Sequence, residues 1–279
     1  MIPTVDFFGA QVTRLILGDN PFNGHSYIRS VVDDDEMMDY YTANKCVEAL
    51  FEAEANGINT YCALGSPFIL RVLRQYRNEG GKMHILFQSY PAIDLEVNVR
   101  MMMACEPIAI YHQGGSLDLM SEEDDWDLIR NRLKIIRDSG VAVGFGTHVP
   151  ETVARAEREN WDVDFYFTCL YNARRTQRGQ KSGFITGKSK ELVFFPEDPA
   201  IMYETIKAVK KPCVAFKIYA GGQIFLGKTP EEMPAAAEKA VKNTFANIKP
   251  DDMICIGAFQ KKKNEIKENA DIVKRALSV

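Results

Sequence analysis

Short apolar runs recur along the whole chain, and each is followed by a longer segment with helical periodicity. Eight such runs occur, at residues 14–18, 58–63, 84–89, 108–113, 141–146, 163–171, 212–218 and 253–259. Nearly continuous apolar character is typical of strands that are buried on both faces, as in a parallel sheet covered by helices. The alternation therefore predicts an α/β fold built from repeated strand-helix units.

The segments between the runs have the pattern of amphipathic helices. In residues 44–57, for example, Val47, Leu50 and Phe51 share one helical face, and Gly57 supplies a stop. Eight strand-helix units in 279 residues match a closed (β/α)8 TIM barrel, which typically has about 250 residues. A doubly wound open sheet is the alternative. We expect one domain over residues 1–279, with long loops after strands one and six, at residues 20–41 and 173–197.

Charge and composition indicate the kind of partner that the chain binds. The net charge is -4 and the pI is near 5.7, so no basic surface for nucleic acid or anionic membrane is expected. The N-terminus lacks the pattern of a signal peptide, and no stretch has 18 consecutive apolar residues. Six scattered cysteines without a CxxC pair predict reduced thiols. We therefore expect a soluble, cytoplasmic protein that binds a small-molecule substrate; its oligomeric state is left open.

In a TIM barrel the reactive groups lie where strands end, so candidate catalytic residues can be taken from those positions. A lysine that ends an apolar strand costs desolvation unless it faces a cavity or a partner. Histidines at neighbouring strand ends indicate a site more strongly than one alone. The candidates are Asp19, Cys62, Gln88, His112, His148 and Lys217, with His25 on a nearby loop.

Several of these segments resemble the aldo-keto reductases, and the likeness runs through nearly the whole chain. "VDFFGAQVTRLILGDNPFNG" is similar to the family's N-terminal hairpin and first strand, and "IAIYHQ" resembles its fourth strand. "IRDSGVAVGFGTHVPETVARA" resembles the strand-five segment, and "ICIGAFQKKKNEIKENADIV" the last strand and helix. The resemblance implies a TIM barrel with an N-terminal β-hairpin.

The resemblance also implies four catalytic groups, of which this chain retains one. His112 matches the family's catalytic histidine, which orients a carbonyl group. Cys62 stands where the family has an aspartate, Pro67 lies near the place of its tyrosine acid, and Gln88 replaces its lysine. A neutral amide cannot lower the pKa of a phenol as an ammonium group does. Reduction of a carbonyl would thus need a different proton donor.

The family's cofactor suggests NADP for this chain. Gly257 lets the backbone approach closely, and Lys261, Lys262 and Lys263 are expected to open a helix whose N-terminus favours a phosphate. Glu268 and Asn269 match the family's Glu-Asn pair near the adenine. Three more residues are expected around the nicotinamide: Thr147, Asn172 and, stacked on the ring, Phe216.

Three functions remain open at this point. The first is an NADP-dependent oxidoreductase acting on a small carbonyl or sugar-like substrate. The second is a lyase, isomerase or hydrolase of a sugar-like substrate that uses His112 and His148, with or without a metal. The third is a non-catalytic binding protein. A metal is the weaker expectation because the histidines lack HxH or HxxxH spacing.

Overall fold

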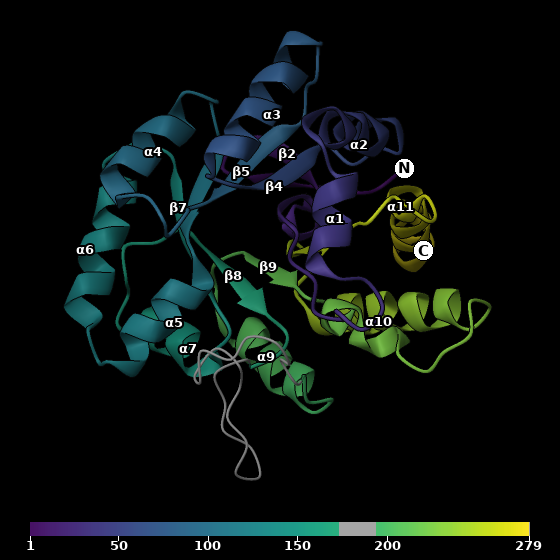
Figure 1. The fold of residues 1–279 in the computed structure, drawn as a ribbon. Coiled ribbons are helices and arrows are strands. Elements are labelled where there is room, and N and C mark those ends of the chain that lie inside the picture. The colour runs from purple at the N-terminus through teal and green to yellow at the C-terminus, as the bar shows by residue number, and fades with distance from the viewer. Residues whose placement is uncertain (173–193, 279) are drawn as a thin grey trace.

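Eight parallel strands close into a barrel in the computed structural model, which describes residues 1–172 and 194–278 (Figure 1). The order around the barrel is β10-β3-β4-β5-β6-β7-β8-β9. The strands are β3 (Leu15–Gly18), β4 (Thr60–Leu64), β5 (His84–Gln88), β6 (Ala109–His112), β7 (Ala142–Thr147), β8 (Phe165–Cys169), β9 (Cys213–Phe216) and β10 (Met253–Gly257). Each overlaps one of the eight apolar runs. The predicted (β/α)8 barrel is confirmed, and the open sheet is excluded.

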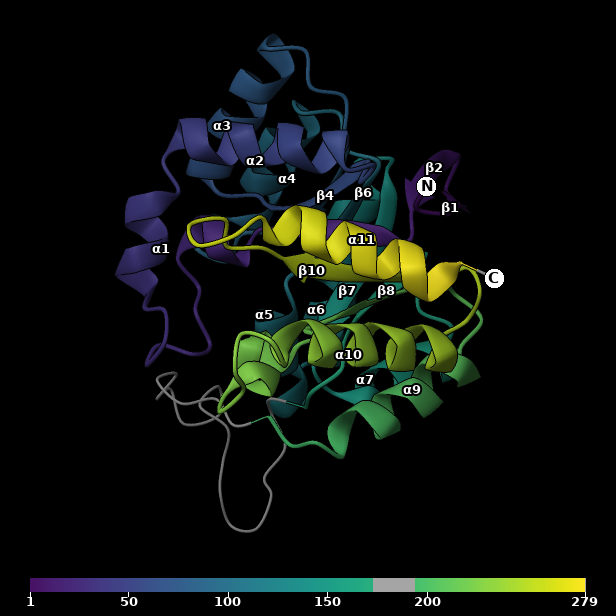
Figure 2. The ribbon, with the colours of Figure 1, turned by 90° about the vertical axis from the view of Figure 1, so that its right-hand side faces the viewer.

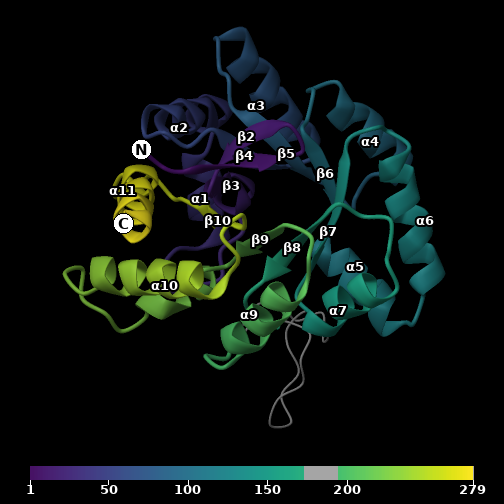
Figure 3. The ribbon, with the colours of Figure 1, turned by 180° about the vertical axis from the view of Figure 1, so that it is seen from behind.

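An antiparallel hairpin precedes the barrel, as predicted. It consists of β1 (Thr4–Phe7) and β2 (Ala10–Thr13), with Phe7 opposite Ala10. Figures 2 and 3 show it at the end of the barrel opposite α1 (Asp34–Tyr40). The ring of Phe7 packs against that of Phe165 inside the barrel, with 5.1 Å between centroids. The hairpin therefore closes one end of the barrel, and polar groups gather at the other.

Helices surround the barrel. Besides α1 they are α2 (Ala43–Ala55), α3 (Pro67–Asn78), α4 (Leu95–Met103), α5 (Gly114–Glu122), α6 (Trp126–Arg137), α7 (Pro150–Arg158), α9 (Asp198–Ala208), α10 (Met233–Asn247) and α11 (Glu265–Leu277), with 3-10 turns η1 (Asn20–Asn23) and η2 (Ala220–Phe225). Helices α1, α4 and α5 were not predicted from the sequence. The loop after the first barrel strand contains η1 and α1, whereas residues 173–193 of the other expected loop lie outside the described part. Within the described ranges, every helix is too short or too polar to span a bilayer.

Side chains alternate along each barrel strand between the interior and the helix layer. In β5 and β6, Leu86 and Tyr111 pack inside, while Ile85 and Ile110 pack toward the helices. The interior is tight: a Cβ on Gly144 would lie 2.6 Å from the ring of Phe165. All six cysteines are free thiols, as predicted. The alternation also decides which residues at the strand ends face the open end of the barrel.

Candidate functional site

The open end of the barrel holds a cavity of about 250 Å³. Polar groups that line it are Asp19, His25, Ser26, Cys62, Gln88, Tyr111, Lys217, Cys255 and Glu265. Aromatic side chains, among them Tyr27, Phe167, Phe216 and Tyr219, form much of the remaining wall. A concave, mostly apolar site with a few convergent polar groups is typical of small-molecule binding. Four predicted catalytic residues, Asp19, Cys62, Gln88 and Lys217, are thus brought together.

Asp19 follows β3 directly, and its side chain is buried. Its Oδ2 accepts hydrogen bonds from the backbone N–H of Leu64 at 2.5 Å and from Nδ2 of Asn23 at 3.0 Å. Burial raises the pKa of Asp19 to about 7, although both hydrogen bonds favour the charged form. Both protonation states of Asp19 are therefore populated near neutral pH, which suits a general acid or base.

The floor of the cavity is built around Tyr111, a residue that the sequence did not single out. Its hydroxyl donates to Oε1 of Gln88 at 2.7 Å and lies 3.6 Å from Sγ of Cys62. Its ring stacks on Phe167 with 4.3 Å between centroids. Burial raises the pKa of Tyr111 well above its usual value, so the phenol stays protonated. Cys62 is a buried thiol of this floor, next to Cys255.

Lys217 comes directly after β9 and has a left-handed backbone, with φ of 60°. That conformation costs a residue with a Cβ about 1–2 kcal/mol, and such residues cluster at functional sites. The Nζ atom lies 4.3 Å from the centroid of the Tyr27 ring and 5.0 Å from that of Phe194. Cation–π contacts of this kind stabilise an ammonium group. Lys217 therefore presents a fixed cation at the wall of the cavity.

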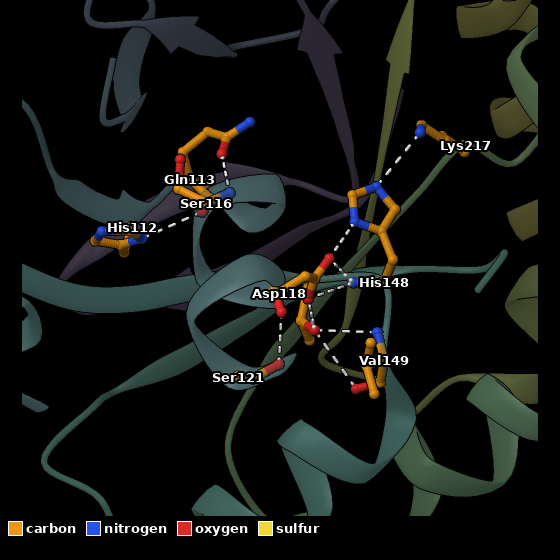
Figure 4. Close-up of polar contacts among 9 residues, drawn as sticks. His112, Gln113, Ser116, Asp118, Ser121, His148, Val149 and Lys217 are labelled. Carbon is orange, nitrogen blue, oxygen red and sulfur yellow. Dashed lines mark hydrogen bonds and ion pairs between the residues drawn. The ribbon is translucent and has the colours of Figure 1, made fainter. Parts of the chain in front are cut away.

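His148 lies beside Lys217 and is held by an acid that the sequence did not indicate. Its Nε2 is 3.4 Å from Nζ of Lys217, and its Nδ1 is 2.7 Å from Oδ2 of Asp118 (Figure 4). Asp118 belongs to α5 and is fully buried. It also accepts hydrogen bonds from the backbone N–H of His148 and from the hydroxyl of Thr147. Because Asp118 accepts at Nδ1, the imidazole is held with Nε2 toward Lys217.

His112 lies outside the cavity at the barrel mouth. The alternation along β6 turns Tyr111 into the barrel and His112 toward the helix layer. There Nε of Arg132, on α6, donates to Nε2 of His112 at 2.7 Å, and Figure 4 shows the His112 ring away from His148. Burial, together with the Arg132 charge, lowers the pKa of His112 to about 3. Among the described residues that line the cavity, His112 is absent. Its catalytic role stays a prediction.

Of the residues expected to hold the phosphates and the adenine of the nucleotide, Gly257 is the one that lines the cavity. Gly257 lines the cavity and packs on Pro21, where a Cβ would come within 2.8 Å of the proline ring. Lys261 pairs with Glu36 at 2.8 Å. Lys262 is exposed, and Lys263 pairs with Glu268. Asn269 accepts a hydrogen bond from the hydroxyl of Tyr219. Helix α11 starts at Glu265, so the lysines precede it rather than open it.

The residues expected around the nicotinamide are not brought together. Phe216 lines the cavity, but Thr147 points at Asp118 on the helix side. Asn172 lines a separate, smaller cavity between α7 and α9, where its backbone N–H donates to Asp198. Of the residues expected around the cofactor, Gly257 and Phe216 line the large cavity, whereas Lys261 and Lys263 are held in ion pairs with Glu36 and Glu268. In the described ranges, no group of three or more His, Cys, Asp or Glu side chains is placed to hold a metal ion.

The fold and site define a (β/α)8 barrel with a polar cavity at the carboxyl ends of its strands. No protein-family model matches this chain, and no curated protein matches it. Solved structures with a similar fold include an aldo-keto reductase from Bacillus halodurans in its holo form, at TM-score 0.60 and 11% identity, covering 98% of this chain and 91% of that one.

Other solved barrels, one of them also an aldo-keto reductase, are similar as well. An aldo-keto reductase from Brucella melitensis has a TM-score of 0.51 and 10% identity, covering 98% of this chain and 93% of that one. A dihydropteroate synthase from Xanthomonas albilineans, in complex with indole-2-carboxylic acid and 6-chloroguanine, has a TM-score of 0.54 and 12% identity, covering 99% and 96%. Such distant likeness shows the shared fold alone. The resemblance to aldo-keto reductases remains an interpretation of the sequence.

Proposed function

We propose that this protein is an enzyme, a lyase or isomerase that moves a proton at the carbon next to a carbonyl group of a small, sugar-like molecule. The observation that carries the proposal is Asp19, a buried carboxyl group at the cavity wall whose pKa lies near 7. A carboxylate with such a pKa takes up a proton efficiently at neutral pH and can return it. Asp19 thus acts as the general base and then as the acid.

Lys217 supplies the complementary charge. When Asp19 removes the proton from carbon, the electron pair moves onto the carbonyl oxygen and forms an enolate. A fixed ammonium group in a largely apolar cavity stabilises that developing charge without rearrangement. The Nζ atom of Lys217 lies over the rings of Tyr27 and Phe194, and Nε2 of His148 is 3.4 Å from it. Asp118 and His148 are therefore positioning residues for Lys217.

Exchange of carbon-bound hydrogen tests this step without knowledge of the complete reaction. The protein is incubated in D2O with small hydroxyketones, aldoses and 2-keto acids, and loss of the α-hydrogen signal is followed by proton NMR. We expect exchange for at least one compound, and a loss of about 100-fold or more in Asp19→Asn and Lys217→Met, a range typical of a removed general base or electrostatic group. Exposed Asp39→Asn is the matched control. Equal exchange in Asp19→Asn and the wild type would refute the proposal.

A second candidate is an NADP-dependent oxidoreductase of aldo-keto reductase type. The segment from Gly257 to Glu265 favours it, since both of these residues border the cavity and Lys261 and Lys263 lie between them in the chain. NADP would supply a hydride when bound, and Phe216 would lie within the same cavity. Titration with NADPH, followed by nucleotide fluorescence, tests this candidate. No binding at millimolar cofactor would exclude it, whereas binding that Lys261→Met together with Lys263→Met weakens would support it.

A further inference from the structure

Cys169, the last residue of β8, stands between the two strand ends that carry His148 and Lys217. In the register of β7 and β8, Thr147 pairs with Thr168, so His148 comes next to Cys169. On the other side, Cys169 pairs with Phe216, the residue before Lys217. Three consecutive barrel strands thus place a thiol, an imidazole and an ammonium group beside one another. The proposed function uses His148 and Lys217 but gives Cys169 no role.

The contacts of Cys169 are those of a nucleophile rather than of an apolar filler. Its side chain is fully buried and hydrogen-bonds with the imidazole of His148. His148 is in turn held by Asp118 at 2.7 Å. A nucleophile whose base is oriented by a third group is the arrangement of the catalytic triads. The backbone N–H of Tyr171 also points to the sulfur atom and favours its negative charge.

The surrounding charges favour a thiolate. Burial by itself raises the pKa of the Cys169 thiol, but the charges of His148 and Lys217 more than offset this. The net effect lowers the pKa of Cys169. Burial and the Lys217 charge lower the pKa of His148, yet Cys169 and Asp118 outweigh them, and the net effect raises it. Both shifts favour a thiolate–imidazolium pair. Three other thiols differ, because burial outweighs their charged neighbours and the net effect raises the pKa of Cys46, Cys105 and Cys213.

Cys169 borders a small cavity. The residue lines a cavity of about 60 Å³ between α7 and α9, separate from the large cavity at the barrel mouth. Glu151 and Asn172 also border this space. It has room for a peroxide, since a water needs about 10–15 Å³ by the same measure.

We infer that Cys169 is a peroxide-reactive thiol, activated by His148 and Asp118, which hydrogen peroxide converts to a sulfenic acid. The sulfur atom attacks one peroxide oxygen, the O–O bond breaks, and the imidazolium of His148 gives its proton to the departing hydroxide. The products are Cys169–SOH and water. The sulfur is oxidised by two electrons, and the peroxide is reduced by the same number. This reaction does not depend on the proposed lyase or isomerase activity.

The inference is tested by measuring, with mass spectrometry, how fast each cysteine of the folded protein is oxidised. The folded protein is treated with hydrogen peroxide for a series of times, unfolded in the presence of dimedone, digested and quantified peptide by peptide. We expect Cys169 to react at least tenfold faster than Cys105 at pH 7, although Cys105 is the more exposed of the two. Lowering the pH to 6 should slow Cys105 more than Cys169, because the thiolate of Cys169 persists to lower pH.

Two variants separate activation from simple access. His148→Asn and Asp118→Asn should each bring the rate of Cys169 to within about twofold of Cys105, while the rate of Cys105 stays the same in both. Circular dichroism shows whether each variant is folded. If His148→Asn or Asp118→Asn does not fold, Lys217→Met provides a third test, since it should slow the oxidation of Cys169 by a smaller factor. The inference is overturned if Cys169 in the wild type reacts no faster than Cys105, or if His148→Asn leaves its rate unchanged.

Discussion

Replacement of Asp19 by asparagine should make the protein more stable at alkaline pH. The carboxyl group is buried, and its pKa is about 7 in the folded protein against an ordinary value of 3.8. A group with a raised pKa binds more protons in the folded state than in the unfolded state between those two values. Its contribution to stability is therefore fully present below about pH 4 and is lost as the pH rises through 7.

The size of the effect follows from the same two values. They differ by about 3 pH units, and each unit corresponds to 1.36 kcal/mol, so ionised Asp19 costs about 4 kcal/mol of the free energy of unfolding. Asparagine keeps an acceptor oxygen for the N–H groups of Leu64 and Asn23 and carries no charge at any pH. The stability of Asp19→Asn relative to the wild type should therefore rise by about 3–4 kcal/mol between pH 4 and pH 8.

Urea unfolding followed by tryptophan fluorescence measures this difference, since Trp126 and Trp161 report on the barrel and its helices. Exposed Asp39→Asn, which removes a carboxylate from the surface, is the control. Curves for Asp19→Asn and the wild type that run parallel from pH 4 to pH 8 would refute the reasoning. They would show that Asp19 titrates as an ordinary solvated carboxyl group, which would also remove the main support for its acid–base role.

Three further predictions concern the barrel and its surroundings. The pKa of His112 is lowered to about 3, so stability is lost as the pH falls below 6.5, because the unfolded chain takes up the proton first. In His112→Gln we expect a smaller loss of stability between pH 4 and pH 7, measured by urea unfolding. An unchanged slope of stability against pH would contradict this prediction. Gly144→Ala should lower stability by about 1–3 kcal/mol in thermal unfolding, because its Cβ would lie 2.6 Å from the Phe165 ring. An unchanged melting temperature would show that the ring moves freely. Tyr41→Phe should lower the free energy of unfolding by about 1–3 kcal/mol in the same assay. The buried Tyr41 hydroxyl donates to the Ala258 carbonyl at 2.7 Å and accepts from the backbone N–H of Gln260, and both bonds would be lost. Tyr40→Phe, the control, should change stability little.

The eight barrel strands were predicted from sequence because a parallel strand buried on both faces must be apolar nearly throughout. Helices α1, α4 and α5 were not: the buried face of α4 includes a polar residue, Asn98, among Leu95, Val99 and Met102, and α5 begins with two glycines. The candidate site was predicted in part. Asp19, Cys62, Gln88 and Lys217 line the cavity, because their positions at strand ends follow from the barrel itself.

The choice between His112 and Tyr111 shows where sequence reasoning stops. The two residues are neighbours at the end of one strand, and a shift of one position moves a side chain from the barrel interior to the helix layer. A likeness in sequence selected His112, whereas alternation along β6 turns Tyr111 into the cavity. Counting outward from apolar Ala109, which faces the interior, would have identified Tyr111.

The sequence by itself determined the repeating strand-helix architecture and the strand ends at which polar groups collect. Those properties depend on local periodicity, which can be read along the chain. Only the tertiary structure decided that Asp118, His148, Cys169 and Lys217 lie together, because they come from a helix and three strand ends whose order in space depends on barrel closure. The raised pKa of Asp19 likewise arises from burial, and burial exists only once the chain has folded.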